Sequence, residues 1–234
     1  MARISLFIGT IVPLPESGRP TGMFKHPVKA SLQLGFEGFI GDEQADRRVH
    51  GGPEKAVHLY PATHYARLAE RFPEAADQLQ PGSLGENISS PALDETQVRI
   101  GDVFQLGDAR LQLCQPRSPC WKIDDRFGVD GMAAFIAEQR LTGWYFRVLQ
   151  PGTVTPDSTL DLVEPAANAS TLAAAMILWQ AHRPPLEALR QLAATPGIAG
   201  GWQRKIVERL AWLEKQPGQT APAPPAFHVK PEAP

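Results

Sequence analysis

Cys120 is the residue of this sequence with the clearest capacity for chemistry. It follows an apolar, strand-like stretch over 109–114, comes directly after Pro119, and is flanked by Arg117 and Lys122. Cationic neighbours favour the thiolate, the form of cysteine that attacks electrophiles and binds metal ions. The prolines around it end a strand and restrict the path of the following loop. We therefore expect Cys120 to be a nucleophile or a single-thiolate metal ligand.

The second cysteine of the chain, Cys114, has a different setting. Two thiols six positions apart make no disulfide framework, and they are too few for a zinc site of four paired ligands. Cys114 lies inside the apolar stretch itself. This pattern predicts a packed core thiol rather than a reactive one.

A charged, glycine-paired loop precedes another apolar strand over residues 46–60. Paired glycines, here Gly51 and Gly52, let backbone amides approach an anion closely, and Arg48 and Lys55 add positive charge. The loop can therefore bind a phosphate or another oxyanion. A hairpin loop with solvated charges explains the same residues, and the segment alone does not separate the two interpretations.

Three further side chains are weaker candidates for a binding site. Asn87 ends a glycine-rich turn over 82–87 and can both donate and accept hydrogen bonds, although a turn that enters a strand is the better explanation of this segment alone. Lys25 is a candidate basic anchor or a surface charge. His58 lies two residues before Tyr60 on a predicted strand, so both face one side, which is either a pocket or the core.

Composition limits the class of protein. The chain has 234 residues, 43% of them hydrophobic, which is enough for one large domain with or without an appendage. A net charge of −2 gives no basic field for nucleic acid. There is no apolar run of about 18 residues, as a membrane span requires, and no signal peptide pattern, so we expect a cytoplasmic protein that does not enter a membrane.

Short strands separated by turn residues dominate the chain up to Glu164, which predicts a mainly β fold, a barrel or a sandwich, with some helices. The segments 61–71 and 130–140 have the spacing of amphipathic helices. The predicted strands are Arg3–Ile11, Lys29–Ser31, Phe36–Phe39, Ala56–Tyr60, Glu86–Ser89, Val98–Ile100, Val103–Leu106, Arg110–Cys114, Gly143–Val148 and Thr159–Leu162.

The pattern becomes helical after Glu164, with Ser170 as the expected first N-cap. The last nineteen residues are rich in proline and are predicted to be disordered. The predicted helices are Ser170–Trp179, Pro185–Ala194 and Gly200–Lys215. The predicted division of the chain is a β-barrel domain over 1–165, a three-helix extension over 166–215 and a tail over 216–234.

Four ordered motifs together resemble a known family. They are D-x-R-x-H-G-G-x-x-K-A-V over 46–57, G-x-x-G-E-N over 82–87, I-G-D over 100–102 and P-R-x-P-C-x-K over 116–122. This series resembles the MOSC domain, named for the molybdenum cofactor sulfurase C-terminal region. The helical segment that follows resembles the extension of its YiiM-like branch.

The resemblance implies a MOSC-type β-barrel that binds molybdenum cofactor (Mo-molybdopterin), with Cys120 as the thiolate that ligates molybdenum or handles sulfur. It also carries a family-level association with pyridoxal phosphate. The YiiM-like branch implies reduction of N-hydroxylated bases such as 6-hydroxylaminopurine to the amine and water. The residues that it nominates for cofactor binding are Lys25, Arg48, His50, Gly51, Gly52, Lys55, His58, Asn87 and Arg117.

A reductase of this kind needs electrons, and the chain has no motif for flavin, haem or an iron–sulfur cluster. We therefore expect a separate electron-donor protein and a small N-hydroxylated substrate. The helical segment fits either intrachain packing or a homodimer. Two other functions stay open: a non-enzymatic carrier of the cofactor or of sulfur, with a persulfide on Cys120, and a structural module that recruits a partner.

Overall fold

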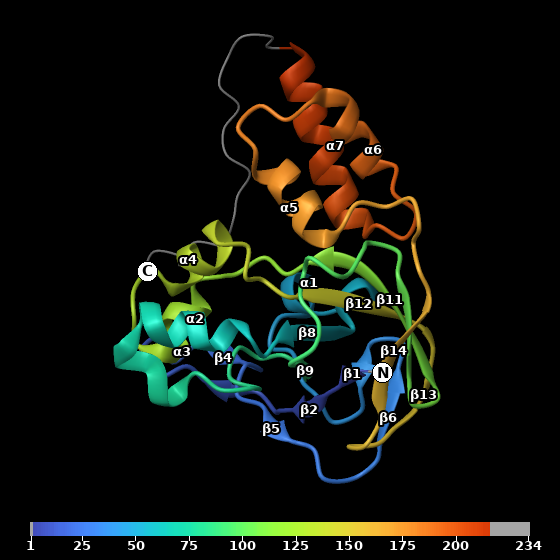
Figure 1. The fold of residues 1–234 in the computed structure, drawn as a ribbon. Helices are drawn as coiled ribbons and strands as arrows, with labels where there is room; N and C mark the ends of the chain where they lie inside the picture. The colour runs from blue at the N-terminus through green and yellow to red at the C-terminus, as the bar shows by residue number, and fades with distance from the viewer. Residues whose placement is uncertain (1, 216–234) are drawn as a thin grey trace.

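The structure, a computed structural model, describes residues 2–215, apart from the side chains of Ala2, Arg48 and Val49. Within these residues a nine-stranded mixed sheet curls into a half-barrel, helices lie beside it, and three further helices stand over one end (Figure 1). Its strands, in pairing order, are β1 (Ala2–Arg3), β14 (Thr159–Glu164), β10 (Val103–Leu106), β11 (Ala109–Pro116), β12 (Trp144–Gln150), β8 (Val57–Pro61), β9 (Ile88–Ser90), β2 (Ser5–Ile8) and β5 (His26–Pro27). Two small sheets pair β13 (Gly152–Val154) with β6 (Leu32–Gly35) and β7 (Gly38–Phe39), and β3 (Val12–Pro13) with β4 (Pro20–Thr21).

The N-terminal run explains why the sheet curls. Strands β1 and β2 are separated by Ile4 alone, yet they lie near opposite ends of the pairing order. Ala2 pairs with Leu160 on β14, whereas Leu6 pairs with Ile88 on β9. One continuous segment therefore joins both ends, and the sheet cannot lie flat. The predicted barrel-type fold is confirmed.

Buried and partly exposed side chains alternate along the strands, and this alternation orients the sheet. Along β11, Ala109, Leu111 and Leu113 are buried, while Arg110 and Gln112 between them are partly exposed. Successive side chains of a strand point to opposite faces, so this alternation places one face against the core. The β8–β9 pair is parallel and the other strand pairs of the large sheet are antiparallel.

Two hydrophobic cores lie on either side of β8. One includes Tyr60, Leu68, Ile123 and Met132 and joins the sheet to the helices that lie beside it. Those helices are α2 (His64–Arg71), η2 (Pro73–Gln78), α3 (Lys122–Phe127) and α4 (Met132–Glu138). The other core is continuous from the barrel into the C-terminal helices α5 (Leu172–Gln180), α6 (Leu186–Ala193) and α7 (Gly200–Lys215). These helices are therefore packed on the barrel rather than tethered to it.

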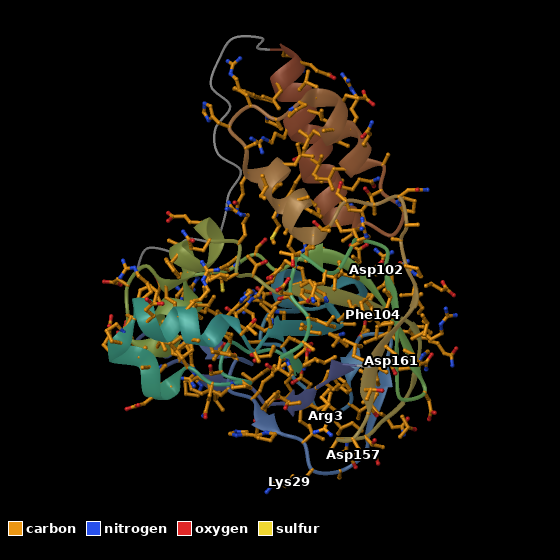
Figure 2. The ribbon with its side chains drawn as sticks, in the orientation of Figure 1. Arg3, Lys29, Asp102, Phe104, Asp157 and Asp161 are labelled. Carbon is orange, nitrogen blue, oxygen red and sulfur yellow. The ribbon has the colours of Figure 1, made fainter. Side chains whose placement is uncertain are left out.

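The I-G-D motif fastens the barrel to the segment that leads into these helices. The buried Asp102 carboxylate accepts hydrogen bonds from the backbone N–H groups of Arg99 and Ala166, each at 2.7 Å. Gly101 has φ +96°, and a Cβ there would lie 2.7 Å from the carbonyl oxygen of Pro196, so only glycine fits this approach. Figure 2 shows that Asp102 lies closer than Phe104 to the C-terminal helices α5, α6 and α7.

Glu54 makes a second connection. It lies in the short helix η1 (Pro53–Lys55), which follows α1 (Arg47–His50). Its Oε1 accepts hydrogen bonds from the backbone N–H of Gly200 at 2.9 Å and from Nη2 of Arg147 at 3.0 Å. The N-terminus of α7 is thereby joined to the glycine-rich loop and to β12.

Several predicted elements differ from the structure. Val98–Ile100 is a turn with a single bridge from Arg99 to Thr171, because Asp102 turns the backbone back on itself. A strand was predicted over 29–31, but the observed strand, β6, begins after this segment, at Leu32. The N-cap of α5 is Thr171 rather than Ser170, since its hydroxyl accepts a hydrogen bond from the Ala174 N–H.

The predicted tail, 216–234, lies outside the described residues, and the domain division at 165/166 stays a prediction. Within residues 2–215, no helix has the length and apolar character needed to cross a membrane.

Asp102→Ala should lower the free energy of unfolding by about 1–3 kcal/mol, because two buried backbone N–H groups lose their acceptor. Asp157→Ala, at an exposed position, is the matched control. Thermal and urea unfolding measure both variants. Equal stability of the two variants would contradict the anchoring role of Asp102.

Candidate functional site

A small cavity opens beside Cys120. Its volume is about 70 Å³, and its lining comes from segments far apart in the chain, among them Lys25, His58, Asn87 and Arg117. The Cys120 side chain is only 3% exposed, so the cavity is its route of access. Helix α3 begins two residues later, and Lys122 at its start donates a hydrogen bond to the carbonyl oxygen of Pro20 at 2.8 Å. This contact holds the loop that carries the thiol at its C-terminal end.

Arg117 is the most unusual residue of this cavity. Its backbone N–H donates to the carbonyl oxygen of Gly143 at 3.1 Å, which holds the loop after β11 against the start of β12. The residue is 8% exposed, and its guanidinium makes no hydrogen bond or ion pair with the residues that the structure describes. A buried cation without a partner is costly unless a ligand supplies the anion.

His58 adds a second polar group without a partner. It lies within β8, is buried, and its Nε2 has no hydrogen-bond partner in the described part of the chain. Burial, together with the nearby positive charge of Arg117, lowers the pKa of His58 well below its ordinary value of 6.5. The imidazole is therefore neutral at pH 7, and its Nε2 is buried in the wall of the cavity.

Lys25 and Asn87 also line the cavity, but the protein itself satisfies them. Lys25 forms a buried ion pair with Asp42, and burial still lowers the pKa of its ammonium group. Asp42 also accepts a hydrogen bond from Nδ2 of Asn87 at 2.9 Å, and Oδ1 of Asn87 accepts one from the His58 backbone N–H at 3.1 Å. These residues fix the wall of the cavity, and the charge of Lys25 is compensated.

A larger groove of about 590 Å³ runs from the cavity to the helical extension. Cavity and groove share four lining residues, His50, Lys55, Arg117 and Tyr145, so they form one continuous site. Gly51 and Gly52 of the glycine-rich loop also line the groove. Of the predicted residues in this loop, Arg48 has its side chain outside the described part of the structure.

The two cysteines have different surroundings, as the sequence predicts for Cys114. Its thiol is fully buried in the core and donates to the carbonyl oxygen of Glu54 at 3.1 Å. Burial raises the pKa of Cys114 to about 12, so this group stays a thiol. Because the neighbouring carbonyl accepts a hydrogen bond, a serine hydroxyl would also find a partner there.

Sequence reasoning missed three groups of the site. Asp42 was visible only as half of a Gly-Asp turn, and Tyr145 only as part of a strand. Arg204 and Lys205 of α7 line the groove although they follow the Cys120 loop by more than eighty residues. No local pattern indicates these approaches, since tertiary folding alone brings them together.

Comparison with known proteins identifies the family. The sequence profile of the MOSC domain matches residues 46–161. Protein YiiM of Escherichia coli (strain K12) is 36% identical over 207 residues, which cover 88% of this chain and 91% of that protein. The chain belongs to the MOSC domain family. It falls in the YiiM-like branch, because the similarity to YiiM continues well beyond the matched domain.

Solved structures agree with this placement in the MOSC family. The crystal structure of E. coli YiiM superposes with a TM-score of 0.75 at 29% identity and covers 90% of this chain and 92% of its own. YiiM from Geobacillus stearothermophilus gives a TM-score of 0.75 at 27% identity, covering 89% of this chain and 98% of its own. A protein of Gibberella moniliformis named "Reductase" is 35% identical over 128 residues, 54% of this chain and 23% of that protein.

Membership of the MOSC family makes this a molybdenum-cofactor-associated domain. All four motifs that suggested the family lie within residues 46–161, the range that the MOSC profile matches. In the structure, the loops of three of them, the D-x-R-x-H-G-G, G-x-x-G-E-N and P-R-x-P-C-x-K motifs, line the cavity. The fourth, I-G-D, is the anchor of the extension.

Stability should depend on pH through His58. Below pH 6.5 the unfolded chain protonates this residue while the folded protein keeps it neutral. The free energy of unfolding should therefore fall by about 1.4 kcal/mol per pH unit as the pH drops below 6.5, towards the lowered pKa of the folded state.

Urea unfolding of the wild type and His58→Gln between pH 7.5 and 5 measures this effect. The glutamine variant should lose this component of the pH dependence, whereas His26→Gln, at an exposed position, should retain it. A constant difference in stability between the wild type and His58→Gln across this range would rule out a neutral, buried His58.

Proposed function

We propose that this protein is a molybdenum-cofactor-dependent reductase of N-hydroxylated compounds, with Cys120 as the protein ligand of molybdenum. The observation that carries the proposal is the pairing of Cys120 with the unpartnered guanidinium of Arg117 on the wall of one cavity. Thiolate is a suitable soft ligand for molybdenum, and a buried arginine without a counter-ion suits an anionic cofactor.

The residues present fit such a cofactor. A cavity of about 70 Å³ is too small for a pterin, but the adjoining groove of about 590 Å³ lies in the range of small-molecule sites. The cofactor is a pterin that carries a phosphate and a dithiolene. Arg117 and Lys55 can bind its phosphate, the Gly51-Gly52 backbone can approach closely, and His50 can hydrogen-bond the ring system.

The cavity has properties that suit reduction of an N–O bond. Bound molybdenum cofactor supplies the two-electron redox chemistry. Conversion of a hydroxylamine to the amine and water consumes two electrons and two protons, so polar groups must stand near the reacting atoms. His58 lines the cavity as a neutral imidazole, while Arg117 disfavours cations at the same place.

Substitution of each cysteine tests the metal ligand. Expressed in a host that makes the cofactor, the wild type should copurify with molybdenum and pterin. Cys120→Ser should lose at least tenfold in bound molybdenum and in reductase activity, with unfolding unchanged. Cys114→Ser, the matched control, should keep its metal and cost about 1 kcal/mol or less in stability, because its hydroxyl can bond the Glu54 carbonyl.

Other outcomes of this experiment point elsewhere. A sulfane-sulfur adduct on Cys120 without metal would reject the reductase in favour of a sulfur carrier. Full metal content in Cys120→Ser would reject Cys120 as the ligand.

A separate electron-donor protein, a small N-hydroxylated substrate, a cytoplasmic location and a homodimer are further parts of this proposal. The purified, cofactor-loaded protein alone should not oxidise NADH in the presence of 6-hydroxylaminopurine, but should reduce this base with a chemical reductant such as reduced methyl viologen. Absorbance at 340 nm and chromatography of adenine measure the two reactions. Steady NADH turnover without a partner would refute the need for a donor protein.

A further inference from the structure

One face of α7 forms a wall of the groove. Gly201, Arg204, Lys205 and Glu208 all line it, and their spacing of three and four residues places them on one side of the helix. The arginine and lysine side chains are exposed at the mouth of the groove, and neither makes a hydrogen bond or ion pair with the residues that the structure describes. The helical extension thus contributes charge to a site whose thiol belongs to the barrel.

Cations from two parts of the chain line the groove. Lys55 of η1 and Arg117 come from the barrel, and Arg204 and Lys205 come from α7. Burial lowers the pKa of the Lys55 ammonium group, and the positive charge of Lys205 acts in the same direction. Like charges that line one groove repel, and an anion bound between them would offset the repulsion.

The acidic residues of the groove do not cancel this charge. Glu54 lies on its wall, but its carboxylate is bound to Arg147 and to the Gly200 N–H. Glu208 is then the one remaining carboxylate among the described lining residues. With Glu208 as its one carboxylate, the α7 wall of the groove therefore keeps net positive charge from Arg204 and Lys205.

The same groove has an aromatic wall. Trp179 lines it and is held by Arg209, whose guanidinium carbon lies 5.3 Å from the ring centroid and whose Nη1 donates to the Trp179 carbonyl oxygen. Trp202 packs edge-on against it, with the ring centroids 6.4 Å apart and the planes at 82°. A half-buried, rigid indole of this kind suits a planar heterocycle.

The cationic pair of α7 lies outside the MOSC domain. The family profile ends at residue 161, whereas Arg204 and Lys205 follow it by more than forty positions. The proposed function assigns the phosphate of the cofactor to Lys55 and Arg117, which both lie within 46–161. A cationic pair added by the extension therefore has another anion to bind, and the substrate is the remaining ligand of the site.

We propose that the extension recognises a phosphomonoester on the substrate, so that the enzyme acts on N-hydroxylated purine nucleotides in preference to free bases. In this arrangement Lys205 and Arg204 bind the 5′-phosphate, the indole of Trp179 supports the base, and the N-hydroxyl group points to the cavity of Cys120. The proposal rests on the proposed function for its N-hydroxylated group but not for its phosphate site.

Binding of adenosine 5′-monophosphate and of adenosine to the purified protein tests the phosphate site without any reaction. By calorimetry, the monophosphate should bind at least tenfold more tightly than adenosine at low salt, and the preference should shrink as ionic strength rises. The double variant Arg204→Ala, Lys205→Ala should lose the preference. Lys215→Ala, at the exposed end of the same helix, should keep it.

Two further results decide the source of the phosphate. Unchanged molybdenum and pterin content in the double variant, with a KM for the N-hydroxylated nucleotide raised tenfold or more and that for the free base unchanged, supports a substrate phosphate. Loss of pterin with unchanged nucleotide binding would assign the cationic pair to the cofactor and overturn the proposal.

Equal affinity for nucleotide and nucleoside in the wild type would also overturn the proposal. That result leaves the reductase intact if metal and activity persist. Conversely, absence of molybdenum with a retained nucleotide preference would refute the reductase alone.

Discussion

The site depends on the position of Glu54. Its carboxylate holds Gly200 at the start of α7 and Arg147 on β12, while its own carbonyl oxygen accepts hydrogen bonds from the Cys114 thiol and from Nε2 of Gln115. One residue of a surface loop is thus bound to two strands and one helix. The carboxylate is partly exposed, so each ionic contact alone contributes little. Their joint effect is geometric, because they fix both walls of the groove.

The cavity combines compensated and uncompensated charge. Lys25 and Asp42 neutralise each other inside the wall, and Asn87 completes their network. Arg117 and Nε2 of His58, by contrast, have no partner among the described residues. Buried polar groups left in this state cost stability, which proteins accept chiefly at functional sites. The contrast separates the scaffold of the site from the groups that meet a ligand.

Local patterns in the sequence predicted a large part of this architecture. Short apolar segments between turn residues predicted β11 and β12, apolar spacing predicted α7, and the proline-flanked, cationic setting separated Cys120 from Cys114. The turn over 98–100 was mistaken for a strand because its apolar residues are buried by a loop that Asp102 folds back, and apolar content alone does not distinguish the two.

The rest of the site was not accessible to such reasoning. The Lys25–Asp42 pair and the joint placement of Lys55 and Lys205 on the groove depend on the folding together of separate segments. A lysine on an amphipathic helix has the same local pattern whether it faces solvent or a groove. Family motifs reveal the shared domain, and the contribution of the extension emerges only from the folded chain.

The closure of the sheet has a consequence for biosynthesis. Strand β1 is made before the other described strands but pairs with β14, so Ala2 must wait for Leu160 before its ladder forms. Contacts so distant along the chain are slow to establish, and until then β1 has no partner strand and β10 has an exposed edge. The nascent polypeptide therefore passes through a long stage with an open barrel, in which chaperones can protect strands that the finished molecule hides.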